Sequence, residues 1–222
     1  TDKPVIVVGS MRPASAISAD GYLNVVNAIK VAADPQSKGR GCLLVMNDTI
    51  FNGRDVTKNA TYRVEAFQSR DLGPLGFADG DGKIVYYHQP VRKHTTATEF
   101  DVRNLQSLPR VDMVLSYVGA DGTMIEAAAN AGAKGIVSAG TGAGRPTPAE
   151  DAAFDKCFKE KGMLMCLCSR VASGRVVRSP GLQRRGFVAG DNLQPWKARL
   201  LLSLALTKTN NADEIQKMFD MY

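Results

Sequence analysis

Two short apolar runs, each followed by a polar loop, constrain the fold of this chain more than any other feature. Val5–Val8 leads into Gly9–Pro13, and Leu43–Met46 leads into Asn47-Asp48. Runs of this kind are typical of strands buried on both faces of a parallel sheet. The polar residues that follow such strands collect at one edge of the sheet, where ligands bind in α/β proteins. The sequence therefore predicts an α/β fold with a small-molecule site beside these two loops.

Helix-like and strand-like segments alternate along the rest of the chain. Residues 23–33 carry apolar side chains at helical spacing, and Ile84–Tyr87 has the character of a short strand after a glycine-bearing turn. Beyond residue 109 the alternation continues, with strands predicted at 113–117, 135–139 and 163–168 and helices at 123–131, 149–161, 195–206 and 211–222. Alternating strands and helices predict mostly parallel, doubly wound sheets.

Residues 89–109 interrupt this alternation. The segment has no periodicity and contains two prolines, several threonines and scattered charges, which is typical of a linker between domains. We therefore expect two α/β domains, residues 1–88 and residues 110–222, joined by this linker.

The charge and hydropathy of the chain argue against two classes of partner. The net charge of +6 is mildly basic and falls short of the one-signed face of a nucleic-acid-binding protein. No apolar stretch reaches the ~18 residues of a membrane span. We therefore expect neither a nucleic-acid nor a membrane partner. The densest basic stretch, from Arg170 to Arg185, is interpreted as a solvated loop, with polyanion binding as the alternative.

The cysteines lack the spacing of a zinc site. Cys166 and Cys168 lie two residues apart in a predicted buried strand, so their side chains share one face. We expect them to pack as small apolar side chains, and we expect neither a metal nor a cofactor in this protein.

Seven segments of the chain form a recognisable series: GSMRPASAISADG, NDTIFNGRDVTK, GPLGF, RKHTTATEFDV, LPRVD, GAKGIVSAGTGAG and NLQPWKARLLLSLALTKT. In order and spacing they resemble the bacterial type II L-asparaginases, including the mixed glutaminase-asparaginases. The resemblance implies an amidohydrolase that converts L-asparagine, and in some members L-glutamine, to the acid and ammonia through a threonine nucleophile. It also implies a homotetramer, a dimer of intimate dimers, that takes a small-molecule amide substrate.

Two segments of the family do not occur in these 222 residues. The family opens with Thr-Gly-Gly-Thr-Ile-Ala, which carries the nucleophilic threonine, and continues with His-Gly-Thr-Asp, which helps to activate it. Thr1–Val5 resembles the family just after the second segment. The resemblance therefore assigns residues 1–88 to the C-terminal part of the asparaginase N-terminal domain and residues 110–222 to the C-terminal domain. It implies a periplasmic or secreted location, with a cytoplasmic one as the alternative.

Lys58 is the strongest candidate for a catalytic residue. Attack by a threonine hydroxyl requires a group that manages the hydroxyl proton, and a lysine next to a carboxylate can serve. By resemblance, Asp55–Lys58 matches the segment that carries the family's active-site lysine. Ser10 occupies a position where the family offers a main-chain contact to the substrate. We expect Arg12 and Asp20 to pair and to shape the loop around Ser10.

A glycine-rich turn, Gly140–Gly144, corresponds to a family turn that reaches a neighbouring subunit's active site, where an asparagine or serine after the last glycine binds substrate. Arg145 holds that position here, as a substrate-binding candidate. The family also supplies a glutamate before the segment matched by Gly186–Val188, yet no acidic residue lies between Ser173 and Gly190. Loss of that bond to the substrate ammonium costs about 1.5–3 kcal/mol. These departures keep a second interpretation open, a catalytically silent binding or assembly protein with the asparaginase fold.

Overall fold

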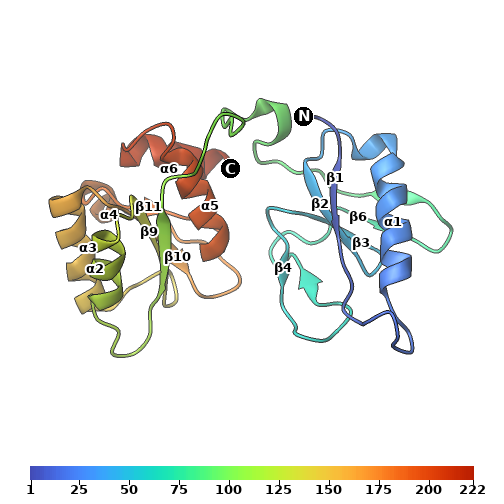
Figure 1. The fold of residues 1–222 in the computed structure, drawn as a ribbon, viewed down its shortest axis with the longest axis horizontal. Helices are drawn as coiled ribbons and strands as arrows, with labels where there is room; N and C mark the ends of the chain where they lie inside the picture. Colours follow the sequence, from blue (N-terminus) through green and yellow to red (C-terminus); the bar gives the residue numbers. More distant parts are fainter. The chain divides into compact units, whose positions relative to one another are not determined.

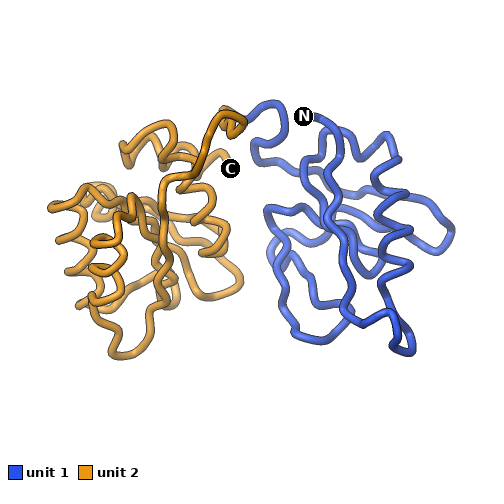
Figure 2. The backbone as a smooth tube through the Cα atoms, viewed as in Figure 1, with its two compact units in different colours: residues 1–98 blue, residues 99–222 orange.

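A computed structural model describes all residues from 1 to 222, and the backbone divides into two units, residues 1–98 and residues 99–222 (Figure 2). Each unit contains one main sheet with helices packed on it, so the expected α/β class is confirmed (Figure 1). No helix combines the length and the apolar composition needed to cross a bilayer.

The first unit is built on a five-stranded sheet with the strand order β1-β2-β3-β6-β7. Its strands and its helix are β1 (Val5–Val8), α1 (Gly21–Ala33), β2 (Cys42–Met46), β3 (Thr49–Asn52), β6 (Gly76–Ala78) and β7 (Ile84–Tyr86). β1 and β2 are parallel neighbours joined through α1, which makes a βαβ unit. The shorter elements are β4 (Thr57–Lys58), β5 (Phe67–Gln68) and the 3₁₀ helices Pro35–Ser37 and Thr95–Ala97.

The rest of this sheet is antiparallel, which differs from the mostly parallel arrangement predicted from the sequence. β2 pairs with β3, β3 with β6 and β6 with β7 in antiparallel register. The cause is the two-residue turn between β2 and β3, where Asn47 and Asp48 have φ values of 52° and 57°. Positive φ at both central residues suits a tight hairpin, and Asn and Asp tolerate that conformation. Asn47-Asp48 therefore reverses the chain into a neighbouring antiparallel strand.

The two faces of the first sheet are covered differently. α1 covers one face, where Val31 packs in a cluster with Leu43, Val45 and Ile50. On the other face Leu44, Met46 and Phe51 pack with partly buried Met11, Val56 and Phe67. The short β4–β5 ribbon therefore contributes Phe67 to the cover of this second face.

The second unit has a wholly parallel four-stranded sheet in the order β11-β10-β9-β8. Its elements are β8 (Val111–Leu115), α2 (Thr123–Asn130), β9 (Gly135–Gly140), α3 (Pro148–Lys161), β10 (Leu164–Ser169), α4 (Pro180–Arg184), β11 (Val188–Ala189), α5 (Pro195–Ala205) and α6 (Ala212–Met221). α2 and α3 pack on one face, and α5 and α6 pack on the other (Figure 1). The predicted doubly wound arrangement is therefore confirmed in this unit.

Local chemistry defines the ends of α3. Thr147 accepts a hydrogen bond from the backbone of Glu150, and the Glu150 carboxylate accepts one from the backbone of Thr147, which forms a capping box. Pro148 occupies the first turn, and Gly162 closes the helix with φ 63°. The Glu150 carboxylate is almost fully buried and also accepts a hydrogen bond from Ser116 at 2.6 Å.

The cysteines of β10 behave as predicted. Cys166 and Cys168 are fully buried on the face covered by α5 and α6, and neither forms a disulfide. Burial, together with the neighbouring Cys168, raises the pKa of the Cys166 thiol well above its ordinary value. These thiols therefore pack as small apolar groups.

Candidate active-site loops

The loop after β1 is organised by Asp20. Its carboxylate accepts hydrogen bonds from the main-chain N–H groups of Met11 and Arg12, both at 2.9 Å, and from the Asn24 amide at 3.1 Å. Burial raises the pKa of Asp20, but these hydrogen bonds outweigh burial and hold its pKa below the ordinary value of 3.8. The Arg12 guanidinium donates to the carbonyl of Ser18 at 2.9 Å. Asp20 thus shapes the loop as expected. Its carboxylate, however, binds the main-chain N–H of Arg12 and not the Arg12 guanidinium.

Two buried asparagines of α1, which the sequence analysis did not single out, join this loop to the β2–β3 turn. The Asn24 amide donates to the carbonyl of Gly9 at 3.0 Å, and its oxygen accepts from the N–H of Asn47 at 2.9 Å. The Asn27 amide donates to the Asp48 carboxylate at 2.8 Å. The two polar loops that follow β1 and β2 therefore meet at one edge of the sheet. Their burial could have been inferred from their spacing, because both asparagines share a helix face with the buried Val31.

Ser10 lies in the loop held by this network. It is exposed and lies two residues after Val8, the last residue of β1. A Cβ atom on Gly21 would lie 3.3 Å from the Ser10 Cβ, so the glycine leaves room for the close approach of the loop to the start of α1.

Lys58 lies at the end of β4 and is exposed. Its backbone pairs with Phe67 of β5, and its Nζ atom lies 5.9 Å from the centre of the Phe67 ring, near the outer limit of a cation–π contact. The carboxylate of Asp55 binds Arg54 at 2.7 Å and the amide of Asn52 at 2.7 Å. The carboxylate nearest to Lys58 in sequence is therefore engaged by other groups.

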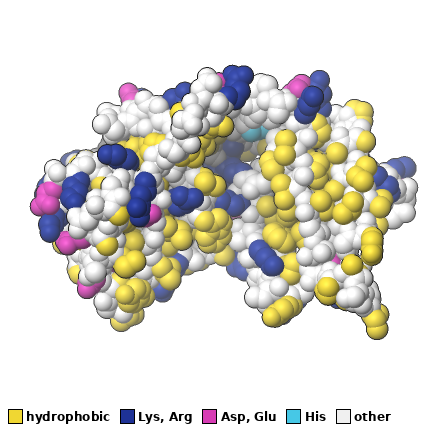
Figure 3. Space-filling view, viewed as in Figure 1, with side chains coloured by type: hydrophobic (Ala, Val, Ile, Leu, Met, Phe, Trp, Pro, Cys, Tyr) yellow, Lys and Arg dark blue, Asp and Glu magenta, His cyan; other side chains and the backbone are white.

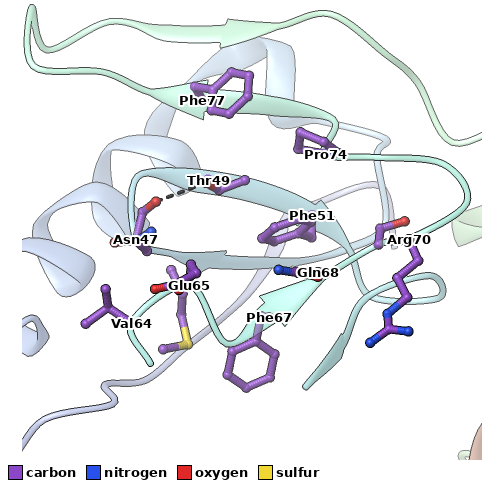
Figure 4. Close-up of a pocket in the computed structure, with 12 residues that line it drawn as sticks. Asn47, Thr49, Phe51, Val64, Glu65, Phe67, Gln68, Arg70, Pro74 and Phe77 are labelled. Carbon is purple, nitrogen blue, oxygen red and sulfur yellow. Dashed lines mark hydrogen bonds between the residues drawn. The ribbon is translucent and has the colours of Figure 1, made fainter. Parts of the chain in front are cut away.

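A cavity of about 500 Å³ lies on the side of the sheet away from α1 (Figure 4). Its apolar wall includes Met46 and three aromatic rings, and its polar side chains include a glutamate, a glutamine and an arginine; these residues are Phe51, Phe67, Phe77, Glu65, Gln68 and Arg70. Phe67 thus forms part of the cavity wall and also neighbours Lys58.

In the second unit, Arg145 closes the turn that follows β9. The main chains of Thr141 and Arg145 exchange two hydrogen bonds of 2.9 Å, and the Arg145 side chain is exposed. A second cavity of about 580 Å³ adjoins this turn and is lined in part by Arg145, Arg175 and Arg185.

The basic stretch that the sequence analysis interpreted as a solvated loop is substantially neutralised. Arg175 pairs with Asp191, Arg178 pairs with Asp213 at 2.6 Å, and Arg185 pairs with two carboxylates of α3 at 2.8 and 2.9 Å. The Arg178 side chain is only 11% exposed, and it also donates to the carbonyl of Phe187. The repulsion of a cationic ligand is therefore weaker than the sequence of this stretch alone predicts.

We expect Asp20→Asn to destabilise the first unit at neutral pH and to have less effect in acid. The folded-state pKa of Asp20 is depressed, so its contribution to stability is present above 3.8 and is lost as the pH falls through the folded-state value. Urea unfolding of both proteins at pH 7 and at pH 3, followed by circular dichroism, measures this difference. An Asp79→Asn variant, at an exposed turn residue, serves as the control. A stability difference that stays constant between the two pH values would contradict the role of the Asp20 charge.

Comparison with known proteins relates these loops to a family. Residues 1–92 match the family model described as Asparaginase, N-terminal, and residues 110–219 match the Glutaminase/Asparaginase C-terminal domain. L-asparaginase 2 of Bacillus subtilis is 43% identical over 222 residues, and a Haemophilus influenzae protein described as a probable periplasmic L-asparaginase is 43% identical over 221 residues. This chain is covered to 100% and 99% in these matches but spans only 58% and 63% of the two relatives.

A solved structure extends the comparison to the fold. The crystal structure of a probable cytoplasmic L-asparaginase from Campylobacter jejuni superimposes with a TM-score of 0.96 and 41% identity. The match covers 100% of this chain and 72% of that structure. The chain therefore belongs to the glutaminase/asparaginase family.

Proposed function

We propose that this chain is the larger part of an amidohydrolase that hydrolyses L-asparagine to the acid and ammonia, with L-glutamine as a second candidate substrate. The observation that carries the proposal is the partly buried hydrogen-bond network of Asp20 and Asn24, which fixes the loop after β1 against the β2–β3 turn in a chain whose whole length matches L-asparaginases. A pre-organised loop pair at one edge of a sheet is a common setting for a small-molecule site in α/β proteins.

The chemistry requires a threonine that these 222 residues do not provide in the family's motif. The threonine oxygen attacks the side-chain carbonyl carbon of the substrate, the C–N bond breaks, and ammonia leaves with the proton that the hydroxyl released. Water then hydrolyses the ester to aspartate or glutamate. In this proposal Lys58 manages the hydroxyl proton, Ser10 offers its main chain to the substrate, and Arg145 binds the substrate in a neighbouring subunit's site, as the resemblance implies for its position.

The assembly and compartment belong to the same proposal. We assign a homotetramer, a dimer of intimate dimers, and a periplasmic or secreted location, because the resemblance to type II enzymes implies both. The relatives' descriptions include one periplasmic and one cytoplasmic protein, so the cytoplasm is the alternative.

A second candidate function is a catalytically silent binding or assembly protein. It is favoured by Arg145 in the place of an asparagine or serine, and by the lack of any acidic residue between Ser173 and Gly190. Such a protein would bind the amide or the acid and release no ammonia.

We expect the purified 222-residue chain to release no ammonia above background from L-asparagine or L-glutamine. We expect a fusion to release ammonia when the part of Bacillus subtilis L-asparaginase 2 outside the match precedes Thr1. A coupled assay for ammonia measures both proteins. Release that co-purifies with the unfused chain would contradict the need for an external nucleophile. A folded fusion that binds L-aspartate in calorimetry without any turnover would favour the silent binding protein.

A further inference from the structure

The cavity of the second unit is lined by the turn after β9, the start of α3 and residues from Arg175 to Arg185. Its volume of about 580 Å³ falls within the ~300–1,000 Å³ that is usual for small-molecule sites. Apolar side chains form much of its wall, namely Ala143, Pro146, Leu167, Val177 and Leu182. Since a water molecule takes up about 30 Å³ in the liquid, the cavity has room for an organic ligand of many atoms.

The charged side chains that line this cavity are three arginines and a single aspartate. Arg185 is held by the fold, because its guanidinium donates to Asp151 at 2.8 Å and to Asp155 at 3.0 Å. Asp151 is the aspartate of the cavity wall, so the lining carboxylate is already engaged by an arginine. The wall of the cavity therefore offers no free carboxylate that would attract a cation.

Two arginines of the wall keep hydrogen-bond donors for a ligand. Arg175 binds the nearly buried Asp191 through its Nε atom, and its two terminal amino groups form no hydrogen bond within the chain. The exposed Arg145 guanidinium has no hydrogen bond or ion pair within the chain. Figure 3 shows basic side chains beside apolar ones on the second unit. Arginine forms paired, charge-assisted hydrogen bonds with carboxylates and phosphates, so these free donors favour an anion.

The turn that carries Arg145 is held by main-chain contacts. Besides the two hydrogen bonds between Thr141 and Arg145, the carbonyl of Gly140 accepts one from the N–H of Arg170 at 3.0 Å. Glycine is required for this close packing, because a Cβ atom on Gly140 would lie 2.3 Å from the carbonyl carbon of Gly144. The backbone at Arg145 is therefore fixed before a ligand binds, which lowers the entropy lost on binding.

We propose that this cavity binds a small organic anion, with its carboxylate or phosphate group held by Arg145 and Arg175 and its carbon skeleton against the apolar wall. The proposal goes beyond the amide hydrolysis proposed above, because the cavity lies wholly within the second unit and binding requires no nucleophile. A long polyanion such as a nucleic acid suits this region less well, since Arg178 and Arg185 are engaged in ion pairs within the chain.

Titration calorimetry on the 222-residue protein tests the site with three probes at one ionic strength: succinate, its uncharged diamide succinamide, and inorganic phosphate. We expect succinate or phosphate to bind at a single site and succinamide not to bind. The amide NMR shifts of Gly144, Val177 and Leu182, which line the cavity, should change on binding. Tighter binding of succinate would identify the ligand class as carboxylates, and tighter binding of phosphate would identify it as phosphate esters.

Arg145→Gln should weaken this binding at least ~10-fold, because it removes charge-assisted hydrogen bonds to the anion. The variant should fold, since the Arg145 side chain is exposed and has no partner within the chain. The matched control is Arg184→Gln, which removes the same charge from an exposed arginine of α4 that does not line the cavity. Circular dichroism checks that both variants fold.

Three results would overturn the proposal. They are the absence of binding by either anion at millimolar concentration, succinamide binding as tight as that of succinate, and equal affinities of the Arg145→Gln and Arg184→Gln variants. Equal affinities would show an effect of net charge and not of a site. Anion binding that Arg145→Gln alone weakens supports the site, whether or not the restored enzyme releases ammonia. Failure of this proposal is therefore distinguishable from failure of the proposed function.

Discussion

Lys58→Ala is expected to lower the rate of amide hydrolysis by at least ~10²-fold in the fusion that restores the missing part of the enzyme. The loss follows from removing the group that manages the proton of the attacking threonine, and proton transfer by a positioned side chain contributes ~10²–10⁴-fold. The stability of the fold should change little, because Lys58 is exposed and its Nζ atom lies 5.9 Å from the centre of the Phe67 ring. Steady-state ammonia release at saturating L-asparagine measures kcat, and urea unfolding measures stability.

Lys83→Ala is the matched control for this variant. Lys83 is an exposed lysine of the same unit, and it lies in a turn with Asp81 as its ion-pair partner. The Lys83 variant should retain the kcat of the parent fusion. Near-normal turnover by the Lys58→Ala fusion, with the fold intact, would remove Lys58 from the catalytic machinery.

Asn24→Ala is expected to destabilise the first unit by about 1–3 kcal/mol, because it removes three hydrogen bonds of a buried side chain, one of them to a carboxylate. Asn24 is 2% exposed and binds the carbonyl of Gly9, the carboxylate of Asp20 and the N–H of Asn47. Alanine leaves the Gly9 and Asn47 groups without these partners. Native-state hydrogen exchange of the α1 amides measures the loss directly within this unit.

Val25→Ala is the control for the asparagine. Val25 neighbours Asn24 on α1 but its side chain is about half exposed, so its truncation should change the stability of the isolated chain by less than about 0.5 kcal/mol. Equal, small effects of the two substitutions would show that the Asn24 hydrogen bonds do not hold the loop. In the restored fusion, Asn24→Ala should also lower activity, because the loop around Ser10 depends on the same contacts.

The positions of the major helices and buried strands were predictable because burial leaves a local pattern. The predicted helix at 149–161 corresponds to α3 (Pro148–Lys161), and the strand at 163–168 corresponds to β10 (Leu164–Ser169), with ends that differ by at most one residue. The short strands β3 and β6 were not predicted, because three or four residues are too few to show a period.

Contacts between distant segments decided the direction of strand pairing and the partners of buried polar side chains, which the local sequence pattern does not show. The sequence by itself determined the two-part α/β organisation, the family motifs and the buried pair Cys166 and Cys168. Only the tertiary structure showed that Asn47-Asp48 reverses the chain into an antiparallel strand. An apolar run in the sequence does not reveal whether the strand beside it runs parallel or antiparallel. It also showed that the inner face of α1 includes two buried asparagines, since the groups that satisfy Asn24 and Asn27 come from loops up to 23 residues away. A buried polar side chain is stable only with such partners, and tertiary contacts supply them here.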